Sequence, residues 1–429
     1  MTHQLHLSRS VICICIDKTG QSPTLFMRAA CRRMETRNNT YIKMRTHIGT
    51  ASINKKVTMN YNNAAYRNLA KKYSLEAMIG PDEGESLLLE LLVHCFTIEE
   101  AELAAHLPIF YKTHTLEKVA RTVGKEPADI KPLLDAMVSR GVIRGRGKGY
   151  AHLPILPGMF ENVLMDNLDT PWHREFARIA NRLYETGYVR KYLEHPTRVV
   201  RTVPLNLEQG PAGTAVDPDR VEQMIRSHDL MAVLNNCQCR HARHLEGQEC
   251  KRADRLDGCF AFGNIATLYI DRGGARAVDR DSMRSIVKDR ISKNLTFFAG
   301  NVAAGSANQI CTCCECCCHM LGQIIGVDPG LIVTTPKFRA VVNEDRCTDC
   351  GRCLAPCNLR AHTMEGKRHR YDPSRCVGCG LCVRACPAAA IDMFETDGYR
   401  KPAADLKRLA VRLAPAKIMA VIKGKLVRK

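Results

Sequence analysis

Two runs of cysteines in the last quarter of the chain constrain it more than any other feature. The first run has the spacing C-x-x-C-x-x-C-x-x-x-C and comprises Cys347, Cys350, Cys353 and Cys357. The second has the same spacing 29 residues later and comprises Cys376, Cys379, Cys382 and Cys386. Four thiolates at these intervals can enclose one cubane of iron and sulfide, because a short irregular loop turns three sulfurs inward and a distant fourth closes the site. Two runs therefore predict two clusters.

The repeat includes more than the cysteines. At the same shift, Gly351 pairs with Gly380 and Met364 with Met393. The segment resembles the bacterial-type ferredoxin with two [4Fe-4S] clusters, in which the fourth cysteine of each run serves the other cluster. The resemblance implies one cluster on Cys347, Cys350, Cys353 and Cys386, and a second on Cys376, Cys379, Cys382 and Cys357.

One position departs from the ferredoxin pattern. The family has proline after both fourth cysteines, and this chain keeps Pro387 but has Asn358 after Cys357. We expect the change to affect the rigidity of the turn and not the ligation. A pair of zinc sites is the alternative, which three cysteines within seven residues disfavour because zinc ligand pairs are normally separated by a longer loop.

Length and composition indicate a multi-domain globular protein. A chain of 429 residues predicts about three domains, and no apolar run approaches the ~18 residues that span a bilayer. The 22 cysteines are spaced as metal ligands in a chain too long for a small disulfide scaffold. We therefore expect a soluble protein in a reducing cytoplasm, without a transmembrane segment.

The formal net charge of +19 has two explanations. Basic surfaces bind nucleic acid, anionic membranes or acidic partners. Alternatively, arginines around the cysteine runs offset the anionic clusters. Residues 1–58 contribute disproportionately to the charge, and we expect them to be a disordered basic arm, a targeting peptide or an over-long reading that starts before the natural Met59.

Residues 59–160 have helical periodicity. We expect a helix over 86–96, a second opened by the capping box of Thr97 and Glu100 with Ile98 on its buried face, and a third after Thr115. A fourth should begin after a cap at Asp129 and end at Gly141. A hairpin over 142–153 completes a pattern that resembles a winged helix, whose phosphate contacts would be Arg144, Arg146 and Lys148. A packing module is the alternative, because acidic residues interrupt the helix that would enter the groove.

The centre of the chain holds a second cysteine constellation. After a buried strand at 232–234 come Cys237, Cys239, Cys250 and Cys259, followed by six cysteines between Cys311 and Cys318. A Cys-x-Cys pair on extended backbone directs both thiols to one face, so we expect Cys237 and Cys239 to face one metal. Cys311, Cys314 and Cys317 keep a three-residue period and could share one side of a turn. These residues predict a further iron–sulfur centre, with zinc or free redox thiols as alternatives.

Together these features resemble a group of prokaryotic proteins described only as 4Fe-4S binding or dicluster ferredoxin-type. We expect a multi-domain α+β fold: a basic extension (1–58), a winged-helix-like helical domain (59–160), a central cysteine-rich α/β region (161–335), a ferredoxin-like ββα repeat (336–396) and a basic tail (397–429). In the tail, Leu406, Leu409 and Leu413 have helical spacing.

Three functional hypotheses follow. The first is an iron–sulfur electron carrier or oxidoreductase subunit that needs a redox partner protein, because no G-x-G-x-x-G fingerprint for a nicotinamide or flavin follows a predicted strand. The second is an iron–sulfur regulator whose winged helix binds DNA, so that nucleic acid ranks second among partners. The third is a thiol/disulfide-type reductase that uses the Cys311–Cys318 run, on an analogy with heterodisulfide reductases whose Cys-Cys-Gly pattern this chain lacks. We rank a carrier or subunit above a stand-alone enzyme.

Overall fold

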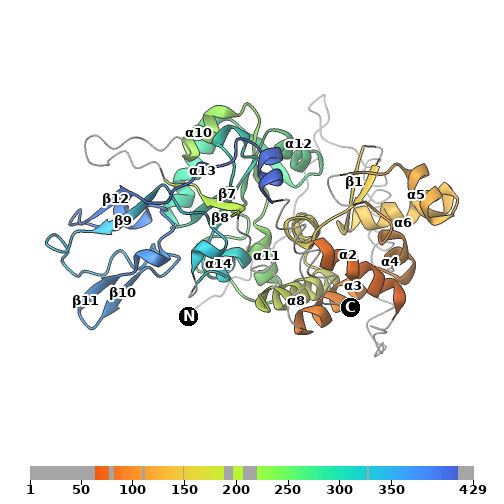
Figure 1. Cartoon of the computed structure of the whole chain (residues 1–429), viewed down its shortest axis with the longest axis horizontal. Helices are drawn as coiled ribbons and strands as arrows, with labels where there is room; N and C mark the ends of the chain where they lie inside the picture. Colours follow the sequence, from red (N-terminus) through yellow and green to blue (C-terminus); the bar gives the residue numbers. More distant parts are fainter. Residues whose placement is uncertain are drawn as a thin grey trace, which may run out of the picture. The chain divides into compact units, whose positions relative to one another are not determined.

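The structure is a computed structural model that describes residues 63–76, 82–108, 112–147, 149–187, 197–205, 220–325 and 328–413. These residues belong to the unit Met59–Lys429. They form a mixed α/β fold with several small sheets (Figure 1). The predicted extension over 1–58, Lys148 in the predicted wing and the end of the basic tail lie outside the described residues.

Helices dominate the first part of the described chain. They are α2 (Ala64–Glu76), α3 (Asp82–Cys95), α4 (Ile98–Ala104), α5 (Leu116–Val123) and α6 (Pro127–Ser139). Thr97 and Glu100 form the predicted capping box of α4, and Thr115 caps α5 through the Lys118 N–H. Gly141 has the predicted left-handed conformation, with φ +77°. These helix boundaries follow local side-chain chemistry, which the sequence displays directly.

Two predictions about these helices are wrong. Helix α6 begins at Pro127 with Glu126 as its cap, not after Asp129, and Pro132 lies inside it. Proline is well suited to a first helical position because its missing N–H has no partner there in any case, so Pro127 starts the helix one turn early. Ile98 is 46% exposed, because α4 packs on α2 and α6 through Ala101 and Ala104 instead.

A hairpin follows α6, with β1 (Ile143–Arg146) antiparallel to β2 (Gly149–His152), as the glycine-rich turn predicts. His114, just before α5, forms an antiparallel bridge to Tyr150 of β2. A π-helical turn (Ile155–Met159), α7 (Phe160–Leu164) and α8 (Pro171–Glu185) come next. Phe176, Leu183 and Tyr184 of α8 are buried. The residues after the hairpin therefore contribute to the hydrophobic core.

A six-stranded antiparallel sheet forms the centre, in the order β3-β7-β8-β5-β4-β6. Its strands are β3 (Val200–Thr202), β4 (Met231–Leu234), β5 (Phe260–Phe262), β6 (Ala275–Val278), β7 (Thr296–Gly300) and β8 (Gln309–Cys313). All four residues of β4 are buried, as the apolar run predicts. The sheet brings together segments more than 100 residues apart in sequence, which positions the central cysteines.

Within the described residues, four helices connect these strands and a fifth follows β8. They are α10 (Val221–Ser227), α11 (Gln238–Leu245), α12 (Gly263–Asp271), α13 (Arg280–Ser292) and α14 (His319–Gly322). The apolar face of α10, formed by Val221, Met224 and Ile225, is buried, and Arg220 occupies the N-cap position. Helix α11 packs on α8 and α7. The loops at the start of α11 and before α14 carry most of the central cysteines.

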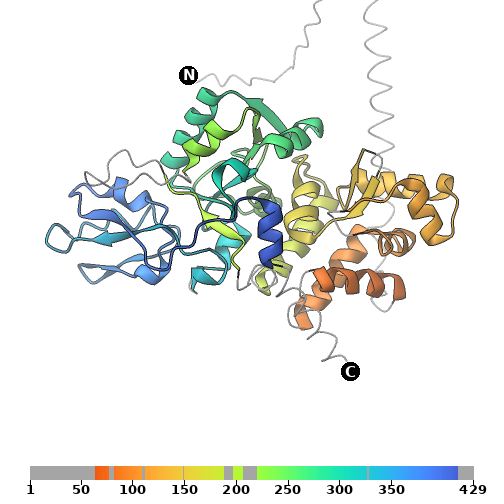
Figure 2. The ribbon, with the colours of Figure 1, turned by 45° about the horizontal axis from the view of Figure 1, so that its top comes forward.

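The last part contains β9 (Phe338–Val342), β10 (His362–Glu365), β11 (Arg368–Tyr371), α15 (Leu381–Ala385) and β12 (Ile391–Glu395). Strand β9 pairs with β12, and β10 pairs with β11. These strands form one group in both ribbon views (Figure 2). Since the first strand of the first half pairs with the last strand of the second half, the sequence repeat closes on itself.

The tail after β12 packs against the central region. Ala403 forms a bridge to Val302, and Leu409 is 6% exposed within the core that holds β5 and β7. Leu406, in contrast, is 48% exposed. The described part of the tail therefore has one buried and one solvent-facing side, as expected for a helix that covers a core.

Candidate metal centres

The backbone of the ferredoxin-type segment repeats as faithfully as its sequence. Positive φ angles occur in pairs 29 residues apart: Asp349 with Gly378, Gly351 with Gly380, and Arg360 with Ala389. The fourth cysteine of each run accepts an equivalent hydrogen bond, from Ala361 N to Cys357 Sγ and from Ala390 N to Cys386 Sγ, both at 3.2 Å. N–H groups directed at sulfur favour the thiolate form. Both loops are therefore shaped to present anionic sulfur.

Two pockets in this segment are each lined by four cysteines. One is lined by Cys347, Cys350, Cys353 and Cys386. The other is lined by Cys357, Cys376, Cys379 and Cys382. Each pocket therefore takes three cysteines from one run and the fourth from the other, and these sets are the same as those that the ferredoxin resemblance implies.

Burial and mutual repulsion raise the pKa of several of these thiols. Burial raises the pKa of Cys353 to about 11 and that of Cys379 to about 12, with further increases from neighbouring thiolates. The thiols whose pKa is raised would be costly to hold as anions without a bound cation. The donor set therefore suits a cationic inorganic core, which removes the protons when it binds.

A histidine pair lies beside the first pocket, and the sequence reasoning missed it. His369 lines the pocket, its Nδ1 is 3.9 Å from Cys347 Sγ, and its Nε2 is 2.9 Å from His362 Nδ1. Burial and His369 lower the pKa of His362 to about 4. The hairpin register pairs His362 with Tyr371 and residue 364 with His369, so the two histidines are diagonal neighbours on one face of the hairpin. The sequence analysis did not predict this hairpin, and its register is the signal that could have indicated the pair.

The central cysteines separate into two groups. In the first, the sulfurs of four cysteines all lie within 4.8 Å of one another; they are Cys250, Cys314, Cys316 and Cys317. Cys250 Sγ is 3.6 Å from both Cys314 Sγ and Cys316 Sγ, and the sulfurs of Cys316 and Cys317 are 3.7 Å apart. Hydrogen bonds from these thiols hold the pKa of Cys250 well below its usual range.

The second group is a closed ring of six cysteines, which in ring order are Cys237, Cys239, Cys318, Cys313, Cys311 and Cys259. The principal hydrogen-bond partners of each thiol are its two neighbours in the ring. The sulfurs of Cys318 and Cys313 are 3.2 Å apart. These bonds lower the pKa of Cys237, Cys318 and Cys311, the last to about 5, and raise it in the alternate members.

Two expectations about these cysteines need correction. Cys237 and Cys239 do not share an extended strand: Cys237 caps α11, and Cys239 lies in the first helical turn. Their thiols still meet because the chain turns from strand to helix between them. Cys311 does not share a side with Cys314 and Cys317, because it lies in β8 and joins the ring. The three-residue spacing of Cys311, Cys314 and Cys317 does not place them on one side, because the backbone changes from strand to turn after Cys313.

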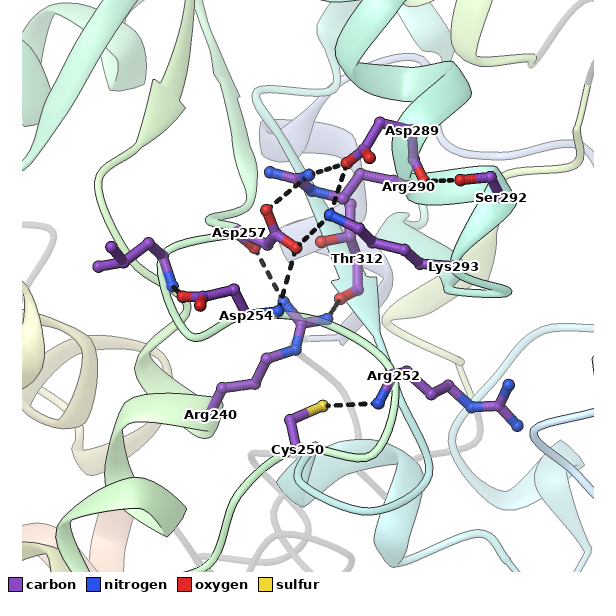
Figure 3. A network of polar contacts seen from close by, with 11 residues as sticks. Arg240, Cys250, Arg252, Asp254, Asp257, Asp289, Arg290, Ser292, Lys293 and Thr312 are labelled. Carbon is purple, nitrogen blue, oxygen red and sulfur yellow. Dashed lines mark hydrogen bonds and ion pairs between the residues drawn. The ribbon is translucent and has the colours of Figure 1, made fainter. Parts of the chain in front are cut away.

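Arg240 lies between the two groups and is 1% exposed. Its guanidinium donates to the Asp257 carbonyl at 2.8 Å and to the Thr312 carbonyl at 2.7 Å (Figure 3). Burial opposes its charge, but thiolates of both groups, Cys237 and Cys314 foremost, raise its pKa further. The next residue, His241, does not face the cysteines through its Nε2, which lies 3.2 Å from the Leu168 carbonyl.

The loop that carries Cys250 is held by ion pairs that the sequence did not reveal. Asp257 binds Arg290 and Lys293 of the α13 end, both at 2.8 Å (Figure 3). Arg252 pairs with Glu315 at 2.5 Å and donates to the Ala355 carbonyl at 2.9 Å. These contacts connect the central loop with the turn after β8 and with the ferredoxin-type segment. In the same region, His244 pairs with Glu249.

None of the helices in the described part of the chain has the length and apolarity needed to cross a bilayer. No curated protein and no solved structure matches the chain. Residues 340–393 match a family model described as a 4Fe-4S dicluster domain. On this match and on the pocket geometry, the C-terminal segment is a ferredoxin-type iron–sulfur domain.

Proposed function

We propose that the chain is an iron–sulfur electron carrier or redox subunit whose ferredoxin-type domain binds two [4Fe-4S] clusters. The observation that carries the proposal is the pair of four-cysteine pockets. In our assignment, Cys347, Cys350, Cys353 and Cys386 hold one cluster. Cys376, Cys379, Cys382 and Cys357 hold the other. Such clusters supply single-electron transfer over a wide range of potentials.

The six-cysteine ring is the proposed internal partner of these clusters. Two proposed ligands of the second cluster contact the central region. One of them, Cys357, packs against the same hydrophobic core as Cys313 and Cys318 of the ring. Cys379 O accepts a hydrogen bond from Leu205 N at 3.3 Å, next to the central sheet. A further cysteine-bound centre in the ring would therefore border the same hydrophobic core as the second cluster.

Paired substitutions test the crossed ligation. Cys350→Ala with Cys386→Ala should remove one cluster and lose about four irons, whereas Cys350→Ala with Cys357→Ala should remove both and lose about eight. Iron and sulfide counts and the electron paramagnetic resonance of the dithionite-reduced protein measure this difference. Cys95→Ser, at a buried core thiol in α3, is the control. The reverse pattern would show that each run binds its own cluster.

We place the DNA-binding regulator second. The order α4, α5, α6 and β1–β2, with the His114–Tyr150 bridge as a third strand, favours a winged-helix topology. However, two cations of the helix that would enter the groove pair with carboxylates: Lys131 of α6 with Asp135, and Arg140 at the α6 C-cap with Glu100. We therefore propose that this part is a packing module. Salt-sensitive binding to duplex DNA by the full chain would reverse the ranking.

A further inference from the structure

The four-cysteine group of the central region differs in kind from the ferredoxin pockets. We infer that Cys250, Cys314, Cys316 and Cys317 bind one mononuclear metal ion, zinc or iron(II), in a tetrahedral site, and that no sulfide belongs to this centre. The inference stands apart from the electron-transfer proposal, because it concerns other residues and a different inorganic group.

The sulfur–sulfur distances carry the inference. In a tetrahedral site with metal–sulfur bonds of ~2.3 Å, the edge between two sulfurs is about 3.8 Å. The measured separations are 3.6 Å from Cys250 to Cys314, 3.6 Å from Cys250 to Cys316 and 3.7 Å from Cys316 to Cys317. All other pairs lie within 4.8 Å. The four thiols thus already enclose a space that fits one ion.

A cubane requires wider spacing. Its four thiolates bind four different irons, so two sulfurs are separated by an iron–iron edge in addition to two iron–sulfur bonds. Within the described residues, no four ferredoxin cysteines meet the 4.8 Å limit that the central group meets. The sulfurs of the central group are therefore closer together than those of the ferredoxin pockets in the same structure.

The surroundings suit a closed structural site. Four thiolates with a divalent ion carry a net charge of −2, and Arg252 N donates to Cys250 Sγ at 3.5 Å. The Arg252 guanidinium reaches Glu315, in the middle of the cysteine turn, and the Ala355 carbonyl. All four metal positions are filled by protein, as in structural zinc sites. The ion would therefore tie the loop of Cys250 to the turn after β8 and support the surface that contacts the ferredoxin-type domain.

Metal and sulfide analysis of the full chain tests the inference. Cys250→Ser should lose about one metal ion per chain and no acid-labile sulfide, while Cys95→Ser, the buried control, should lose neither. The ferredoxin resonance signals should persist in both, which separates this outcome from a failure of the cluster proposal. A loss of sulfide together with several irons in Cys250→Ser would overturn the inference.

X-ray absorption of the unsubstituted protein avoids any dependence on a variant that folds. With zinc at the site, the zinc edge should show four sulfurs at ~2.3 Å and no neighbouring metal. With iron(II) there, cobalt(II) exchanged into the site should give the visible bands of tetrahedral thiolate coordination. A sample with neither the zinc shell nor the cobalt bands would contradict a mononuclear centre.

Discussion

The side-chain amide of Asn358 donates a 2.8 Å hydrogen bond to the hydroxyl of Thr296 in β7. It donates a second, also at 2.8 Å, to the Asn294 carbonyl. Asn358 is 1% exposed and follows a proposed cluster ligand at the position where ferredoxins have proline. The departure that the sequence analysis assigned to turn rigidity therefore also attaches the cluster loop to the central sheet.

Asn358→Ala should weaken this attachment. Removal of a buried donor leaves the Asn294 carbonyl and the Thr296 hydroxyl without it, at a cost of about 1–3 kcal/mol each. We expect a lower midpoint of thermal unfolding and faster hydrogen exchange in β7, with an unchanged iron content. Thr363→Ala, at an exposed position of β10, is the control. If Asn358→Ala lost iron and kept its stability, the residue would act on the cluster and not on the attachment.

Glycine is required in the second cluster loop at Gly378, where φ is +73°. An added Cβ would lie 2.2 Å from the Phe338 carbonyl oxygen and 2.7 Å from Pro336 Cβ. Gly378→Ala should therefore displace β9 and reduce cluster occupancy. Gly366→Ala is the matched control, since φ is +61° there and an added Cβ meets nothing within 4 Å. Equal iron counts in the two variants would show that the crowding at Gly378 is relieved without harm to the site.

Glu161 should make stability depend on pH. Burial, with a smaller effect from Cys311, raises the pKa of this carboxyl from 4.5 to about 7. A pKa raised in the folded state contributes stability below pH 4.5 that is lost as pH rises through about 7, and the full loss is on the order of 3 kcal/mol. Glu161→Gln should remove this loss and be more stable than the unsubstituted protein at pH 8 but not at pH 4.5.

Urea unfolding at the two pH values measures the difference, and Glu344→Gln at an exposed position is the control. A Glu161→Gln variant with the same pH dependence as the parent protein would place the titrating group elsewhere.

Arg240 should be essential to the central cysteine region. Arg240→Met removes the donors to the Asp257 and Thr312 carbonyls and a cation between two groups of thiolates. Each orphaned carbonyl costs about 1–3 kcal/mol, and the loss of positive charge disfavours electron uptake. We expect lower stability and a more negative reduction potential of the central centre. Arg276→Met on the exposed side of β6 should change neither quantity. A similar effect of both variants would show that the net charge of the protein, and not the position of Arg240, sets the stability and the potential.

The sequence predicted those features that short-range patterns encode. The 29-residue repeat indicated the ferredoxin cysteines, and the resemblance to ferredoxins implied their crossed sets. Thr97, Thr115 and Gly141 indicated helix ends through local hydrogen bonds and backbone conformation. The predicted start of α6 was wrong because the true N-cap residue, Glu126, makes no side-chain hydrogen bond that would identify it. Pro127 is the local signal for the first turn of this helix.

The central site could not be read in the same way. Cys250 meets Cys314 across 64 positions of sequence, and the ring joins Cys237 to Cys259 and Cys239 to Cys318. Which thiols meet depends on strand pairing between β5 and β8, and no spacing rule contains that information. The Asp257–Arg290 pair and the His362–His369 pair are long-range or cross-strand contacts for the same reason.

Iron and acid-labile sulfide counts on the anaerobically assembled full chain, combined with electron paramagnetic resonance before and after dithionite, test the central claim most directly. The account predicts at least about eight irons and eight sulfides per chain, with signals from reduced [4Fe-4S] clusters that interact across the paired pockets. A colourless protein that holds only zinc, contains no sulfide and gives no signal after reduction would contradict it.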